Sequence, residues 1–210
     1  MTRVDKMEPG QTLNTGEVTV PREAATVILL RGGGTGLEVL LLERTHAARF
    51  MAGAWVFPGG AVDAADGTGD VAHRAAAVRE LAEEADVHGV DPAALVLFSH
   101  WITPTAVKVR FDTRFFLATL PEGAVPKVDG AECVDLGWFS PADALAARER
   151  DELLMMFPTA KHLEWLARFD TAEALLEHAR GRTVEPMEPR LVTIGDERHV
   201  LLPGEPGYDG

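Results

Sequence analysis

The strings WVFPGG at residues 55–60 and RELAEEADV at residues 79–87 decide the fold expected for this chain. The first reads as a short strand that enters a sharp Pro-Gly-Gly turn. The second closes a run from residue 71 to residue 87 that is rich in Ala, Arg, Glu and Leu and contains neither Pro nor Gly. Such a run predicts a helix, with Asp70 as its N-cap. An acidic loop joins the turn to this helix.

Three carboxylates share one side of the predicted helix. At roughly 100° per residue, Glu80, Glu83 and Glu84 fall within one arc, and the face expected to be buried lies opposite. That buried face is formed by Ala75, Val78, Leu81, Ala82 and Ala85. Arg79 lies one turn from Glu83 and is placed to orient it by hydrogen bonding.

The acidic cluster has two interpretations. Because like charges at this spacing repel, the cluster costs free energy unless a cation bridges the carboxylates, and Mg²⁺ prefers such oxygen ligands. On its own, the triplet is more typical of an ordinary solvent-facing helix. The strand, the Pro-Gly-Gly turn and the acidic loop before the helix favour the metal site, because such a turn can bring backbone carbonyl oxygens to a metal.

Segments outside these strings predict a mixed sheet flanked by helices. The apolar runs at residues 24–30 and 37–42 are separated by the glycine-rich residues 31–36 and predict a hairpin. A phosphate-binding loop is the less favoured alternative there, because no Lys-Ser/Thr follows. Further strands are expected at residues 95–100, 106–110, 115–119 and 134–139. Helices are expected after the N-cap Ser140 and at residues 159–168 and 171–180, and a closing hairpin at residues 190–202 with its turn at residues 194–197. This order of strands and helices indicates the α/β (α+β) class.

Bulk composition excludes several classes of protein. The 210 residues carry a formal net charge of -13, which argues against a nucleic-acid polymer as partner because phosphate contacts need clustered Lys and Arg. A small phosphorylated substrate is still compatible, since a divalent cation can reverse the sign of a local site. Cys133 is the only cysteine, so neither an intrachain disulfide nor a Cys-rich zinc site is expected. No membrane span and no secretion signal are expected, which favours a cytoplasmic protein.

Gly60 together with residues 79–87 resembles the signature box of the Nudix hydrolase superfamily, G-x5-E-x7-R-E-U-x-E-E-x-G-U, in which U is aliphatic. Asp86 stands where the box has glycine, at the expected helix end, where Asp tolerates a left-handed conformation better than most residues. The loop is longer than in the standard box, so Val71 lies where the box has its first glutamate. The expected substitute for that glutamate is Asp66 or Asp70.

The longer loop and its flanks resemble the Nudix branch that contains the peroxisomal coenzyme A diphosphatases. Residues 49–66, 99–104 and 111–116 carry this resemblance, and residues 138–145 resemble the helix opener that follows the last core strand of Nudix domains. The resemblance implies a Nudix-like α/β/α sandwich with a mixed sheet, extra C-terminal helices and a terminal hairpin. The implied organisation is a flexible lead at residues 1–16, a Nudix core at residues 17–150, and a helical extension and hairpin at residues 151–210 packed on the core.

The resemblance also implies chemistry, namely Mg²⁺- or Mn²⁺-dependent hydrolysis of a nucleoside diphosphate linked to another group, here coenzyme A or a derivative. The implied catalytic residues are Arg79, Glu80 and Glu83. The implied metal ligands are Gly60, Glu80, Glu83, Glu84 and Glu132. The implied substrate-binding residues are Arg44, Arg49, Gly59 and His100.

Two alternatives stay open. The substrate of the same chemistry can be another nucleotide, such as ADP-ribose, NADH, a dinucleoside polyphosphate or a nucleotide sugar. The domain can instead be a regulator that binds a nucleotide without cleaving it, although the intact Glu80, Glu83 and Glu84 favour an enzyme. The apolar C-terminal hairpin is compatible with a homodimer contact.

Overall fold

The computed structural model describes residues 2–3, 11–32, 36–48, 50–194 and 197–209. An eight-stranded sheet runs through its centre. The order of paired strands is β4 (Trp55–Val56), β3 (Glu38–Arg44), β2 (Arg22–Arg31), β7 (Phe111–Thr119), β6 (Val96–Ile102) and β9 (Pro186–Met187), with β5 (Gly59–Ala61) on β2 and β8 (Cys133–Phe139) on β3. The β2–β7 and β6–β9 pairs are parallel and the other pairs are antiparallel, so the sheet is mixed, as predicted.

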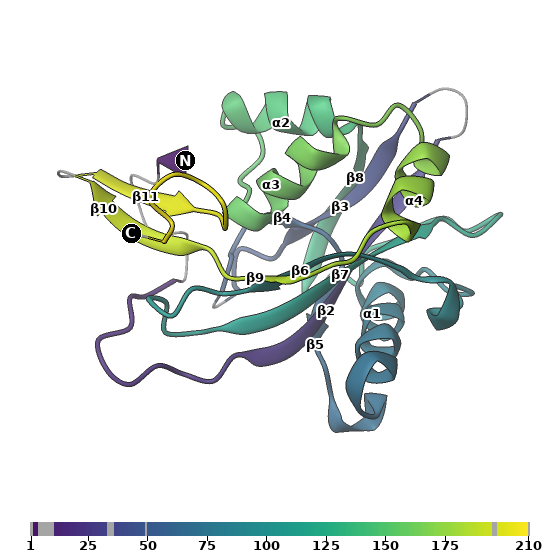
Figure 1. Ribbon diagram of the computed structural model, residues 1–210. Coiled ribbons are helices and arrows are strands. Elements are labelled where there is room, and N and C mark those ends of the chain that lie inside the picture. The colour runs from purple at the N-terminus through teal and green to yellow at the C-terminus, as the bar shows by residue number, and fades with distance from the viewer. Residues whose placement is uncertain (1, 4–10, 33–35, 49, 195–196, 210) are drawn as a thin grey trace.

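Helices cover both faces of this sheet, which confirms the expected α/β/α sandwich (Figure 1). One face carries α1 (Gly69–Ala85), and the other carries α2 (Pro141–Glu149), α3 (Phe157–Leu166) and α4 (Ala172–Arg180). Two short 3-10 helices, η1 (Ala64–Asp66) and η2 (Pro92–Ala94), flank α1 in the sequence. No helix in the described part of the chain combines the length and the apolar character of a membrane span.

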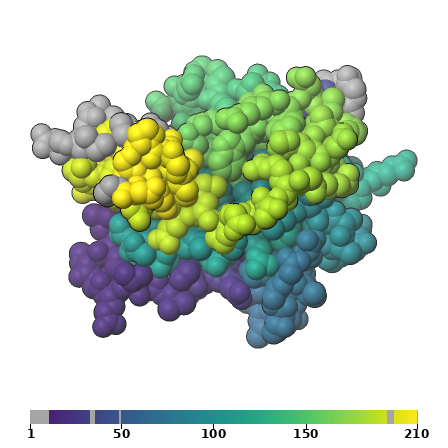
Figure 2. All heavy atoms as spheres, viewed as in Figure 1, coloured from purple at the N-terminus to yellow at the C-terminus, as the bar shows by residue number. Residues whose placement is uncertain are grey.

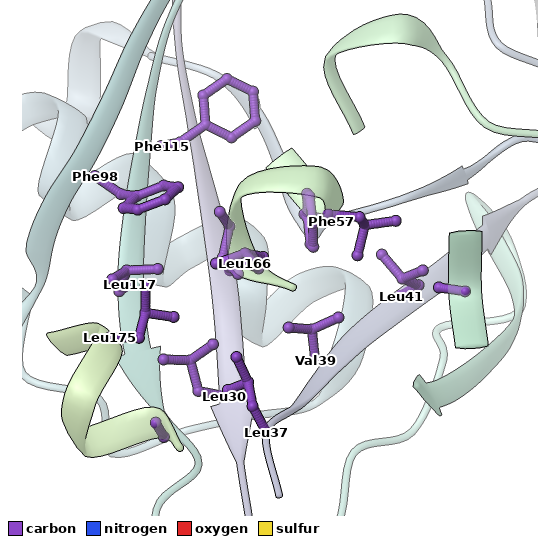
Figure 3. Packing of buried hydrophobic residues seen from close by; sticks show 14 of the residues in the cluster. Leu30, Leu37, Val39, Leu41, Phe57, Phe98, Phe115, Leu117, Leu166 and Leu175 are labelled. Atoms are coloured by element: carbon purple, nitrogen blue, oxygen red, sulfur yellow. The ribbon is translucent and has the colours of Figure 1, made fainter. Parts of the chain in front are cut away.

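The central strands are buried on both faces, which explains their continuous apolar runs. In β2, Ile28 and Leu30 pack toward α3 and α4, while Val27 and Leu29 pack toward α1, because successive side chains of a strand point to opposite faces. Figure 3 shows the first of these clusters, in which side chains of the sheet meet those of the C-terminal helices. The apolar contacts on the two faces fix the positions of α1 and of the C-terminal helices relative to the sheet.

A second, three-stranded sheet stands at one end of the molecule. It consists of an antiparallel hairpin, β10 (Arg190–Ile194) and β11 (Glu197–Leu201), with β1 (Thr2–Arg3) paired to β11. This terminal sheet, yellow at the C-terminal strands, forms one end of the surface beside the green helices (Figure 2). The predicted closing hairpin is therefore confirmed, although residues 195–196 of its predicted turn lie outside the described residues.

Several local predictions are confirmed. β2 and β3 form the expected antiparallel hairpin, with Leu30 opposite Val39. Ser140 caps α2 through a hydrogen bond from the Asp143 N–H at 3.1 Å. Asp86 ends α1 in the left-handed conformation, with φ 52°. These features depend on neighbours in sequence, which explains why local patterns predicted them.

The predicted start of α1 is wrong. The helix begins at Gly69, and the extended residue Thr68 occupies the N-cap position. Asp70 lies inside the first turn, where its carboxylate pairs with Arg74 at 2.6 Å. Its negative charge there is favourable because the helix N-terminus carries a partial positive charge.

Residues 106–110, predicted as a strand, form a turn. The Val107 N–H donates to the Pro104 carbonyl oxygen at 3.0 Å, and Val107 makes an isolated bridge to Leu13. The β-branched residues of this segment suggested a strand, whereas the nearby proline favours the turn that forms.

Candidate functional site

Glu84 is a buried carboxylate on α1, with 3% of its surface exposed. The Gly59 N–H donates to its Oε2 atom at 2.9 Å, and Arg44 Nη1 lies 3.6 Å from its Oε1 atom. Burial raises the pKa of Glu84 to about 7, against the opposing effects of Gly59 and Arg44. A carboxylate held in this way gains from any further positive charge placed beside it.

The helical-wheel prediction of the buried side of α1 is confirmed for Leu81 and Ala85, which are fully buried, but it is wrong for Glu84. Glu84 belongs to the buried side together with Ala76 and Ala77, whereas Val78 and Ala82, predicted as buried, are only partly so. A helical wheel takes into account only the polarity of the residues in α1 itself. The turn before the helix supplies a hydrogen-bond donor for Glu84, and this partner makes burial of the carboxylate possible.

The Gly59-Gly60 turn approaches α1 so closely that side chains there would clash. A Cβ atom on Gly60 would overlap the Glu80 carboxylate, and one on Gly59 would overlap the Ala25 carbonyl oxygen. At Gly59 the clash is with the backbone, so glycine is required there, whereas a side chain at position 60 would displace the Glu80 carboxylate. Burial raises the pKa of Glu80, an effect that Arg79 opposes.

Arg79 gathers the acidic loop and the helix into one network. Its Nε and Nη2 atoms donate to the two carboxylate oxygens of Asp66, at 3.1 and 3.0 Å. Its Nη1 atom donates to Glu80 at 2.8 Å and to Glu83 at 3.0 Å, and its Nη2 atom also donates to the Ala61 carbonyl oxygen. The guanidinium lowers the pKa of Asp66. Of the two expected substitutes for the first box glutamate, Asp66 is therefore the one that contacts Arg79.

These groups line a pocket of about 700 Å³. Most of the residues proposed from the sequence line this pocket, from four separate segments of the chain. They are Arg44, Gly59, Gly60, Arg79, Glu80, Glu83, Glu84 and Glu132. The structure thus brings the proposed metal ligands and one proposed substrate-binding arginine to the same cavity.

One proposed substrate-binding residue does not line this cavity. His100 contacts Asp112 and lines a separate pocket of about 300 Å³ between β6, α3 and α4. Arg49 lies outside the described residues. The structure therefore supports no contact of His100 with a ligand held by the three glutamates.

Much of the remaining lining of the large pocket is apolar. These apolar residues come from β6, β7, the start of α3 and the terminal hairpin, and they include Trp101, Phe111, Phe115, Met156, Phe157, Leu191 and Val200. Sequence reasoning missed these residues as pocket residues. They are scattered over about a hundred positions of the chain, and no local pattern distinguishes them from core residues.

Comparison with known proteins places this arrangement in a family. The NUDIX domain family matches residues 20–159, which include the glycine turn, the acidic loop and α1. This chain belongs to the Nudix family. The match ends within α3, so α4, β9 and the terminal hairpin lie beyond it.

Individual Nudix proteins share only limited sequence identity with this chain. The human protein named acyl-coenzyme A diphosphatase NUDT19 is 33% identical over 120 residues, which cover 55% of this chain and 32% of that protein. The putative nudix hydrolase 7 of Caenorhabditis elegans is 29% identical, over 86% of this chain and 72% of that protein. The crystal structure of a NUDIX hydrolase from Alicyclobacillus acidocaldarius matches with a TM-score of 0.67 and 27% identity, over 77% of this chain and 97% of that one. The Nudix fold is thus shared, while the region matched by the human relative is about a third of its length.

The donor atoms of the Nudix site fit a divalent cation, which Nudix hydrolases generally use. Within the described residues, Glu84 Oε1 accepts no hydrogen bond, and Arg44 Nε and Trp101 Nε1 donate none, although all three atoms are buried. Buried polar atoms normally have partners, so Glu84 Oε1 indicates a place for a cation, whereas the N–H groups of Arg44 and Trp101 suit an acceptor group of a ligand. No three acidic, His or Cys side chains converge as a finished metal cage among the described residues. Arg79 accounts for this, because it occupies oxygens of Glu80 and Glu83 that a cation would share.

Proposed function

We propose that this Nudix protein is a metal-dependent diphosphatase that cleaves the diphosphate linkage of coenzyme A or a coenzyme A derivative. The observation that carries the proposal is a single pocket lined both by four glutamates and by many apolar side chains. Coenzyme A joins a charged adenosine diphosphate to a long and largely uncharged arm, and so needs both kinds of wall. The name of the human relative supports the same class of substrate.

Glu80, Glu83 and Glu84 would hold Mg²⁺ or Mn²⁺, with the Gly60 carbonyl oxygen and Glu132 as further candidate ligands from the same pocket. The metal would neutralise diphosphate charge and lower the pKa of a bound water molecule. Glu80 is the candidate base for that water, since its pKa is already raised by burial. Arg79 would fix the angle between Glu80 and Glu83 through its two hydrogen bonds.

Arg44 is the candidate contact for the substrate phosphates. Its side chain lines the pocket beside Glu84, and its buried Nε atom donates no hydrogen bond within the described residues. A guanidinium with an unused donor suits a phosphate oxygen. Binding there would also place the diphosphate next to the glutamates.

The test is product analysis by mass spectrometry after incubation with Mg²⁺ or Mn²⁺. The substrate panel contains coenzyme A, ADP-ribose, NADH and diadenosine polyphosphates. We expect cleavage of coenzyme A at its diphosphate by the wild-type protein, and loss of this activity in Glu83→Gln and Glu84→Gln. Glu177→Gln on the exposed side of α4 makes the same chemical change away from the pocket and is expected to retain full activity.

Three outcomes would point elsewhere. Faster cleavage of another nucleotide would mean that this nucleotide, and not coenzyme A, is the substrate of the same diphosphatase reaction. Binding of nucleotides with no cleavage of any compound would contradict the enzyme and favour a regulator. Full activity in both glutamine variants would contradict the role of the acidic cluster. The cytoplasmic location, the homodimer and the domain boundaries stay predictions; light scattering tests the homodimer.

A further inference from the structure

The terminal hairpin forms part of the wall of the glutamate pocket. Leu191 on β10 and Val200 on β11 line the same pocket as Glu80 and Glu84. They are directly opposite each other in the antiparallel register, so their side chains project from the same face of the hairpin. Both positions lie beyond residue 159, where the match to the Nudix family ends.

The hairpin is attached to the pocket by strand pairing. Just before β10, the edge strand β9 pairs in parallel with β6, with Met187 beside Trp101. Trp101 is itself a pocket residue with 4% of its surface exposed. The strand that carries the aromatic wall of the pocket therefore also fixes where the hairpin begins.

Hydrogen bonds to Glu188 fix the connection between β9 and β10. Its carboxylate accepts from the Thr105 N–H at 3.0 Å and from Arg110 Nη2 at 3.1 Å. Arg110 is buried and also donates to the carbonyl oxygens of Thr103 and Thr19, so the anchor is tied to two further segments. The Tyr208 hydroxyl donates to the Glu188 carbonyl oxygen at 2.7 Å. A hairpin held from several sides can present a defined surface to a ligand.

The chemistry of this surface differs from that of the glutamate side chains in the same pocket. The Leu191 and Val200 pair is apolar, and the nearest basic residue of β10, Arg190, is engaged by Tyr208 through its carbonyl oxygen and its ring. The facing pocket wall offers Pro104, Val107 and other apolar side chains. An uncharged, apolar group of a ligand would bury the Leu191 and Val200 side chains from water.

We propose that Leu191 and Val200 are specificity-determining residues that bind an apolar group carried by the substrate on the side of the diphosphate away from the nucleoside. The inference rests on the proposed diphosphatase function and adds a selective element outside the Nudix domain itself. An acyl chain on the arm of a coenzyme A thioester is a group of this kind. Lengthening that chain would raise kcat/KM as long as the hairpin supplies the apolar wall.

The experiment compares kcat/KM for coenzyme A and for acetyl, hexanoyl and lauroyl thioesters. The variants are the wild type, Leu191→Ala/Val200→Ala, and Thr193→Ala as a control, since Thr193 lies on the same strand outside the pocket lining. We expect the double variant to lose about tenfold in kcat/KM for the lauroyl compound and clearly less for free coenzyme A, so that the ratio of the two values falls, while Thr193→Ala keeps the wild-type ratio. Circular dichroism and the thermal midpoint show whether the double variant has folded. Leu191→Met, which keeps the apolar volume, is expected to retain the wild-type preference.

An identical dependence on chain length in the wild type and the double variant would overturn the inference. If no compound is cleaved by the wild type, the proposed function has failed, and calorimetric binding then tests the hairpin separately. Tighter binding of lauroyl than of free coenzyme A by the wild type, lost in the double variant, would still support the hairpin role. If the wild type and the double variant preferred lauroyl over free coenzyme A to the same extent, that role would be overturned.

Discussion

At the scale of single residues, Arg79 controls how close the carboxylates of the site can come. Its guanidinium satisfies Asp66 with two parallel hydrogen bonds and reaches Glu80 and Glu83 with a third nitrogen. Without this cation, Glu80 and Glu83 would repel each other across less than one helical turn. A lysine at position 79 would supply the same charge, but it lacks the planar guanidinium group that donates several hydrogen bonds at once.

Arg79→Ala is therefore expected to lower the free energy of unfolding by about 2 kcal/mol, from the loss of charged hydrogen bonds. Urea unfolding measures this change, and steady-state kinetics are expected to show loss of hydrolysis. Arg79→Lys is expected to recover part of the stability and little of the kcat. Arg148→Ala, a change of the same type at an exposed position of α2, serves as the control. Wild-type kcat in Arg79→Ala would contradict this role.

His162 is a second residue whose environment has a measurable consequence. It is fully buried on α3, between Ser99 Oγ at 2.6 Å from Nε2 and the Pro158 carbonyl oxygen at 2.6 Å from Nδ1. In the neutral ring, Nδ1–H donates to Pro158, and Nε2 accepts from the Ser99 hydroxyl. Burial lowers the pKa of His162 to about 4.

This lowered pKa predicts a loss of stability in acid. Between the unfolded-state pKa of about 6.5 and the folded-state pKa of about 4, the unfolded chain binds a proton that the folded chain does not. The contribution of neutral His162 to the free energy of unfolding is therefore complete above pH 6.5. It is lost as the pH falls toward 4, and the total loss is about 3 kcal/mol. Chemical unfolding of the wild type and His162→Gln from pH 7.5 to 4 tests this. The stability gap between the two proteins is expected to narrow with acid, and a constant gap would refute the assignment.

At the scale of secondary structure, local patterns predicted what depends on local sequence. The presence of α1 followed from its strong helix formers, although its predicted start is wrong, and the hairpin of β2 and β3 followed from two apolar runs around a glycine-rich turn. Burial of Glu84 could not be predicted in this way, because its hydrogen-bond partner Gly59 comes from another element. The apolar wall of the pocket was missed for the same reason, since Leu191 and Phe111 become neighbours of one cavity only after folding.

The end of α1 supplies a prediction at this scale. Asp86 has φ 52° and ψ 32°, a left-handed conformation that glycine adopts without steric cost. Its ion pair with His88 is largely exposed and contributes little. Asp86→Gly is expected to raise the free energy of unfolding by roughly 0.5 kcal/mol, and Asp86→Ala to lower it by a similar amount. Thermal unfolding measures both changes, with hydrolysis unchanged. A glycine variant less stable than the wild type would mean that the Asp86 side chain, and not the backbone, determines this cap.

At the scale of the whole molecule, the charge balance sets the conditions for metal binding. The chain carries a formal net charge of -13. Four of the acidic residues, Glu80, Glu83, Glu84 and Glu132, line a single pocket. Folding therefore concentrates negative charge there, and a cation that binds only the folded state would relieve the repulsion and stabilise the protein.

Mg²⁺ or Mn²⁺ is accordingly expected to raise the thermal midpoint of the wild-type protein, and EDTA to reverse the rise. At a metal concentration a hundred times the Kd, the gain is about 2.7 kcal/mol for one site. Differential scanning fluorimetry at constant ionic strength separates this effect from general screening of charge. Glu83→Gln/Glu84→Gln is expected to lose the shift, while Glu177→Gln, which removes one charge from exposed α4, is expected to keep it. An equal shift in all three proteins would mean that the metal acts on the surface charge of the molecule as a whole. Such a result would rule out the glutamates of the pocket as the metal site, even if nucleotide binding were retained.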